Sequence, residues 1–72
     1  MNIVTGAAGL TEEELQVLQL LARGERTSEI AKHLRLEYRN VADISKQLKS
    51  RFAAETVEAL VEFARQAGLV SG

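Results

Sequence analysis

Apolar residues recur along this chain at intervals of three and four, which is the period of an amphipathic helix. Four such stretches follow one another, at about residues 11–23, 27–34, 38–51 and 56–67. Proline is absent and only three residues are aromatic, a composition that favours helices over a sheet sandwich. The pattern predicts an all-α fold, a compact four-helix domain over residues 10–72, with residues 1–9 as a flexible arm or linker.

The same spacing predicts which side chains face the core. In the first helix these are Leu15, Leu18, Leu21 and Ala22, with Val17 and Leu20 flanking them. In the second they are Ile30, Ala31 and Leu34, and Leu36 is expected as a buried plug after it. In the third they are Val41, Leu48 and Phe52, with Ile44 and Ser45 at the margins. The fourth carries Val57, Leu60, Val61, Phe63, Ala64 and Ala67, a set too wide for one core-facing stripe.

The helix ends are also marked in the sequence. Thr11 and Glu14 have the spacing of a capping box, in which each side chain bonds the other residue's backbone. Gly24 is expected to end the first helix in the left-handed conformation, Thr27 to cap the second, and Gly68 to end the fourth. Only about three residues, 35–37, separate the second and third helices. So short a link favours a steep crossing, as in a helix-turn-helix.

The formal net charge is −1, but the charges are unevenly distributed. Residues 32–51 hold six basic residues against two acidic ones, a net charge of +4, and both flanking segments are acidic. Such asymmetry is expected of a local anion-binding face on an otherwise acidic domain. A helix whose solvent side is merely basic would give the same pattern.

Other chemistry finds little support. The chain has no cysteine, and His33 is its single histidine, so a metal site would need carboxylates alone. Neither a nucleophile–base pair nor a glycine-rich phosphate loop is evident, and no apolar run is long enough to span a membrane. We therefore expect no cofactor, no metal, no small-molecule ligand and no enzymatic activity.

The segments LTEEELQVLQLLARGERTSEIAKHL and EALVEFARQAGLV resemble the opening and closing patterns of the LuxR-type helix-turn-helix domain. This domain ends many bacterial response regulators of two-component systems and many quorum-sensing regulators. The resemblance, which runs from Leu10 to Val70, implies a cytoplasmic transcription regulator that binds double-stranded DNA sequence-specifically. It places the third helix in the major groove, the second above it, and a homodimer contact on the fourth. RNA polymerase is a further partner that it implies.

On this reading the residues of the third helix that contact DNA are Tyr38, Arg39, Asn40, Ala42, Asp43, Lys46, Lys49 and Ser50. Weaker contacts to the DNA backbone are expected from Thr27, Lys32, His33 and Arg51. The dimer interface is expected at Val57, Leu60, Val61 and Ala64. Tyr38 could offer its hydroxyl to a phosphate or pack on the second helix.

The chain departs from the family pattern near the expected DNA surface. Arg26 and Glu37 stand where a capping serine is usual, and Asp43 stands where a related subset has asparagine. Asp43 could accept a hydrogen bond from cytosine, form an ion pair with Arg39 or Lys46, or repel phosphate. The ion pair is the commonest outcome at such spacing. These acidic residues leave a second hypothesis open, a degenerate helix-turn-helix that serves as a protein-interaction or dimerisation module.

Overall fold

The structure of the protein, a computed structural model, describes residues 9–70. Its helices are α1 (Glu12–Ala22), α2 (Thr27–Leu34), α3 (Tyr38–Arg51) and α4 (Val57–Gln66), and no strand occurs between residues 9 and 70. The predicted all-α, four-helix fold is confirmed, and each helix end lies within one residue of its expected position. The expected arm at residues 1–9 lies outside the described residues except for Gly9.

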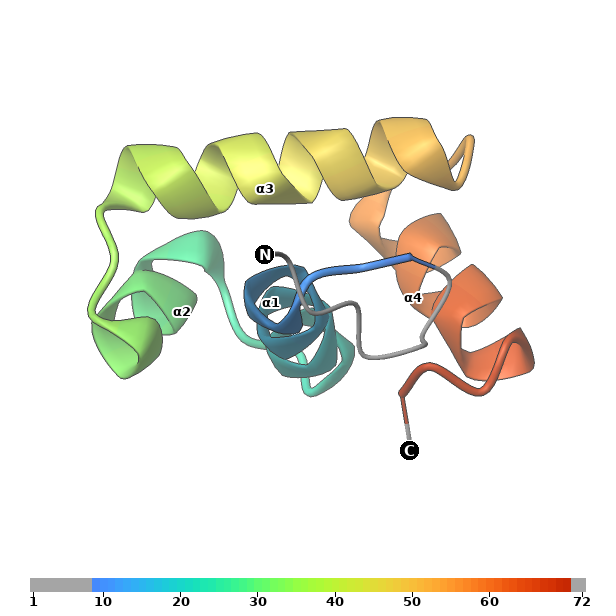
Figure 1. The fold of residues 1–72 in the computed structure, drawn as a ribbon, viewed down its shortest axis with the longest axis horizontal. Coiled ribbons are helices and arrows are strands. Elements are labelled where there is room, and N and C mark those ends of the chain that lie inside the picture. Colours follow the sequence, from blue (N-terminus) through green and yellow to red (C-terminus); the bar gives the residue numbers. More distant parts are fainter. Residues whose placement is uncertain (1–8, 71–72) are drawn as a thin grey trace.

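Helix α1 is the centre of the domain. It packs against α2, α3 and α4, and α3 lies across one side of the group, over the other three helices (Figure 1). Between α2 and α3 the link is Arg35–Glu37, three residues long, as the sequence predicts for a helix-turn-helix. Within the described part of the chain, no helix has the length and apolar character needed to cross a membrane.

The core draws on all four helices and on Leu10, two residues before α1. Its largest fully buried side chains are Leu10, Val17, Leu18, Ile30, Val41, Leu48 and Leu60. Val17 was expected only at the margin of α1, but it is fully buried, whereas Leu15 and Ala22 are half-buried. The reason is that α1 packs against three helices. The positions of these helices, and not the apolar spacing of α1 alone, decide which of its side chains are buried.

Three further expectations about the core need correction. Ser45 was expected at the margin of the buried side of α3, but it faces the domain and only 8% of it is exposed. Phe52, the C-terminal cap residue of α3, is only half-buried because it lies at the edge of the packed helices. Leu36 packs against the core but remains half-buried, so it does not plug the turn completely.

The two ends of α1 form as the sequence predicts. The Glu14 N–H donates to Thr11 Oγ1 at 3.1 Å, and the Thr11 N–H donates to Glu14 Oε1 at 2.9 Å, which completes a capping box. Gly24 has φ +87°, and the N–H groups of Gly24 and Glu25 donate to the carbonyls of Leu21 and Leu20. This is a Schellman motif, which satisfies carbonyls that the helix would otherwise leave unpaired.

Neither α2 nor α3 has a side-chain cap at its start. Thr27 was expected to cap α2, but it is the first helical residue, and the N-cap position belongs to Arg26. The Arg26 N–H instead donates to Glu29 Oε1 at 2.8 Å. Glu37 occupies the N-cap of α3 and makes no capping hydrogen bond. The two residues that replace the usual serines therefore leave both helices of the helix-turn-helix without the side-chain cap that serine provides.

Two residues other than glycine adopt the left-handed conformation. Arg35 has φ 57° at the end of α2, and Ala53 has φ 54° at the end of α3. A side chain in this region costs about 1–2 kcal/mol. The conformation at Arg35 lets the Leu36 N–H donate to the Ala31 carbonyl at 2.9 Å. The tight turn between α2 and α3 is therefore maintained at the expense of local backbone strain.

Replacing Arg35 by glycine should raise the free energy of unfolding. The relieved strain, about 1–2 kcal/mol, exceeds the extra entropy of glycine in the unfolded chain, about 0.4–1 kcal/mol. We expect a net gain of about 0.5–1 kcal/mol, measurable by urea denaturation. Gly24→Ala is the matched control and should lower the free energy, because it places a side chain at φ +87°. A loss of stability in Arg35→Gly would contradict this account of the turn.

Candidate nucleic-acid interface

The outer side of α3 is the candidate interface. Because Val41, Ser45 and Leu48 are buried, the side chains on the opposite side of the helix point into solvent. Those at its centre, all exposed, are Arg39, Asp43, Lys46 and Ser50. In Figure 1 the helix forms one edge of the molecule, with α1, α2 and α4 all beneath it. This arrangement leaves the whole length of α3 accessible to a large partner.

Other residues predicted on this face lie on its margins. Tyr38 is 62% exposed and Asn40 is also exposed, so Tyr38 at the start of α3 projects into solvent and is not packed away on α2. Ala42 and Lys49 are half-buried and lie on the same margin as Tyr38, whereas Asn40 lies on the other margin. Gln47 is exposed and was not among the predicted residues. Its position four residues after Asp43 was a sufficient signal to include it, because i and i+4 side chains are neighbours on a helix.

The acidic residues of this face have no ionic partner. Across residues 9–70 the ion pairs involve neither Asp43 nor Glu37, and both side chains are exposed. The expected pairing of Asp43 with Arg39 or Lys46 is therefore wrong for this structure. An exposed pair of this kind contributes only about 0.2–0.5 kcal/mol, too little to hold a flexible arginine or lysine side chain in one geometry. Asp43 is left free to accept a hydrogen bond or to repel an anion.

Two of the predicted weaker DNA contacts are already held by glutamates. His33 Nδ1 lies 2.6 Å from Glu25 Oε1, and Arg51 Nη1 lies 3.7 Å from Glu14 Oε1. Arg51 therefore ties the end of α3 to the capping box of α1. The remaining two are Lys32, which is exposed on α2, and Thr27, which is half-buried at the start of that helix.

Most of the predicted dimer residues face the core of the single chain. Leu60 and Ala64 are 0% exposed and Val61 is 8% exposed, while Val57 is half-buried. The expectation that Leu60, Val61 and Ala64 form a surface is wrong, because α1 and α3 already cover that side of α4. The apolar residue that α4 does expose is Phe63, at 44%. Phe63 comes three residues after Leu60 and lies about 60° from it around α4, so periodicity alone does not separate it from the buried side.

The side chains of the α3 face are suited to binding a polar or anionic partner through hydrogen bonds and charge. Long cationic and amide side chains on a packed helix can donate hydrogen bonds to phosphate oxygens or to the edges of bases. A group of three or more metal-ligating side chains is not found in the described range, 9–70. What the arrangement offers is a convex, locally basic helix on the outside of a small domain, the shape that enters a DNA groove.

The family comparison agrees with this geometry. Residues 8–64, well over half of the chain, match the model of bacterial regulatory proteins, luxR family. The searches of curated proteins and of solved structures gave no match. The matched range includes α1, α2, α3 and most of α4, so it spans the whole helix-turn-helix. The chain belongs to the luxR family of bacterial regulatory proteins, and its helix-turn-helix is the DNA-binding domain of a transcription regulator.

Proposed function

We propose that α3 is the helix that reads DNA, lying in the major groove with α2 across it. The observation that carries this proposal is the outer side of α3, where Arg39 and Lys46 are exposed on the same side, two turns apart, while Val41, Ser45 and Leu48 are buried on the opposite side. Arg39 and Lys46 would contact guanine edges or phosphates, and Lys49 a phosphate. The regulator would act in the cytoplasm, with RNA polymerase as its downstream partner and a two-component system as its source of control.

The modest charge of this face limits the affinity that we expect from one domain. Glu37 and Asp43 offset part of the charge of Arg39, Lys46 and Lys49. Since phosphate contacts supply much of the affinity of any DNA-binding protein, a single copy should bind weakly. Pairing two copies on a two-fold symmetric site would double the number of contacts, as in other helix-turn-helix regulators.

Binding to duplex DNA should weaken steeply with salt, with a slope of log affinity against log salt of about −0.9 per phosphate contact. Lys46→Ala should reduce affinity by about 1–3 kcal/mol, because it removes a cation from the centre of the face. Arg23→Ala is the matched control, since it removes an exposed cation from the end of α1. Fluorescence anisotropy with labelled duplex would measure both. Equal losses in the two variants would contradict a reading role for α3.

Asp43 separates the proposed function from the second candidate, a domain that no longer binds DNA. Its free, exposed carboxylate at the centre of the face is the observation that favours this alternative. Repulsion between Asp43 and one phosphate at contact distance is worth about 1 kcal/mol in water. That is enough to weaken DNA binding, but it is less than the contribution expected from Arg39 and Lys46 together.

We expect the wild-type chain to bind random duplex and Asp43→Asn to bind it more tightly, by up to about 1 kcal/mol. Glu55→Gln is the control, because it neutralises an exposed glutamate in the α3–α4 link. Anisotropy at low salt would give both affinities. Absence of binding in the wild type with binding in Asp43→Asn would favour the interaction module. Weaker binding of Asp43→Asn to a selected site would instead assign Asp43 to reading cytosine.

We further propose that two copies associate through the exposed side of α4, with Phe63 at the centre. A solvent-exposed phenylalanine is a suitable anchor for such a contact, and Ala67, one turn later, is also exposed. Because a two-fold contact uses the same surface on both copies, Phe63 would lie near its counterpart. The flanking Val57 is half-buried and can contribute only at the edge.

Phe63→Glu should abolish dimer formation, because it would place two carboxylates in an apolar contact. Sedimentation equilibrium over a range of concentrations would measure the loss. Gln16→Glu adds the same charge at an exposed position on α1 and should leave dimerisation intact. Circular dichroism would confirm that both variants retain their helices. A wild-type chain that is monomeric on a symmetric two-site DNA would rule out this interface.

A further inference from the structure

The polar side chains on the outer side of α3 form two parallel rows. Arg39 and Lys46 make a cationic row, and Asn40 and Gln47 make an amide row. Within each row the two residues are seven positions apart, so they lie about 20° apart around the helix and about 10.5 Å apart along it. The two rows are about 100° apart, with Asp43 between them. All five side chains are exposed, so the rows can meet different parts of a DNA groove.

The two sides of this face differ in the charge that they offer to DNA. Lys49 lies about 60° around the helix from Lys46, on the side away from the amide row, and adds a further cation there. Beside the amide row the nearest cation is Arg51, but its Nη1 lies 3.7 Å from Glu14 Oε1 of α1. The ion pairs within residues 9–70 include none of the cations on the other side. The cations available to phosphate are therefore gathered beside the cationic row.

This difference favours one rotation of α3 about its axis in the major groove. The groove is about 12 Å wide, so one side of an inserted helix lies close to a wall of phosphates while another side faces the edges of the bases. Turning the cationic row towards the phosphates brings the amide row over the bases. The opposite rotation would place uncharged amides against phosphate and leave the available cations away from it.

The amide row has the chemistry that adenine requires. The side-chain amide of asparagine or glutamine carries both a donor and an acceptor, which match N7 and the N6 amino group of adenine. Among the side-chain hydrogen bonds of residues 9–70, none involves Asn40 or Gln47, so both amides remain available for such contacts. Their separation of about 10.5 Å corresponds to about three base steps of 3.4 Å.

We propose that the amide row reads the bases and that Gln47 is a specificity-determining residue that recognises adenine. Asn40 would recognise a second adenine, about three base pairs away in the same half-site. Arg39 and Lys46 would bind phosphates, which adds affinity without sequence preference. This inference rests on the proposed function, since it requires α3 to lie in the major groove.

The test selects binding sequences from a pool of randomised duplex DNA with the 72-residue chain at low salt. We expect the wild type to enrich two A·T base pairs about three base pairs apart, and Gln47→Ala to lose the preference at one of them. Changing that pair to G·C should weaken binding of the wild type by about fivefold or more, but should change binding of Gln47→Ala little. Gln16→Ala is the matched control, because it removes an exposed glutamine from α1.

Lys46→Ala separates the two possible rotations of α3. It should weaken binding to all duplexes equally and reduce the salt slope by about one, as expected for a phosphate contact. An enriched G·C pair whose preference is lost in Lys46→Ala would show that the cationic row reads the bases and would overturn the inference. An A·T preference that Gln47→Ala retains would do the same.

Two further outcomes distinguish this inference from the proposed function. If the wild type binds duplex with a steep salt dependence but enriches no sequence, the inference fails while α3 can still be the helix that binds DNA. If the wild type binds no duplex at all, the proposed function fails and the inference fails with it. Circular dichroism would confirm that the variants retain their helices, which is expected because Gln47 and Lys46 are exposed.

Discussion

The enclosure of α1 by the other three helices is the constraint on which this domain depends. A chain of 72 residues buries only about 60% of its unfolded surface, so few side chains can be fully removed from water. Val17 and Leu18 of α1 are among them, and they join Leu10 before the helix to Leu60 of α4 in one core. Removing such a leucine side chain typically costs about 2–5 kcal/mol, a large share of the stability of any small domain. Each of α2, α3 and α4 packs against this helix, and α3 also packs against α2 and α4.

That packing also produces the surface that we assign to DNA. Val41, Ser45 and Leu48 anchor α3 on the domain, so its opposite side is presented as a rigid cationic ridge. The three-residue link holds α2 close to it, although Arg35 must adopt a left-handed conformation to close the turn. The overall charge of −1 conceals this ridge, because the acidic residues are concentrated on other helices. Local charge on a fixed scaffold, and not net charge, is what suits the domain to a nucleic acid.

Much of the fold could be predicted because its signals are local. The capping box of Thr11 and Glu14 and the left-handed Gly24 are formed by residues within one or two turns, so spacing alone predicts them. Side-chain burial was less predictable where it depends on distant helices. From the sequence of α4 alone, Leu60 and Ala64 were expected in an exposed dimer interface, but α1 and α3 cover both side chains. The N-cap of α2 was predicted one residue too late, at Thr27. Arg26 has the extended backbone of an N-cap residue even though its side chain cannot cap the helix.

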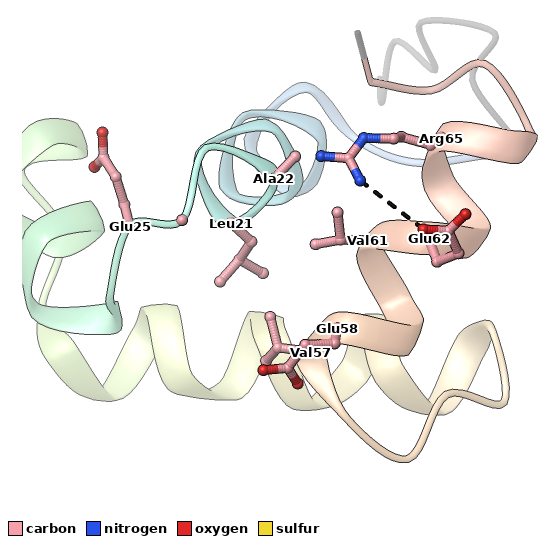
Figure 2. A pocket seen from close by; sticks show the side chains of 9 residues that line it. Leu21, Ala22, Glu25, Val57, Glu58, Val61, Glu62 and Arg65 are labelled. Atoms are coloured by element: carbon pink, nitrogen blue, oxygen red, sulfur yellow. Dashed lines mark ion pairs between the residues drawn. The ribbon is translucent and has the colours of Figure 1, made fainter. Parts of the chain in front are cut away.

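The sequence by itself determined the four helices, their short connections, the basic segment at residues 32–51 and the family resemblance. Each of these depends only on the type and spacing of residues that are close together in the chain. Only the tertiary structure decided which apolar residue of α4 remains exposed, that Asp43 has no ionic partner, and that Arg51 is held by Glu14. The shallow depression between α1 and α4, lined by Leu21, Val61 and Glu58 among others (Figure 2), is also decided by the tertiary structure, since its two walls are more than thirty residues apart in the chain. Periodicity describes one helix at a time, whereas exposure, ion pairing and concavity arise from how several helices pack.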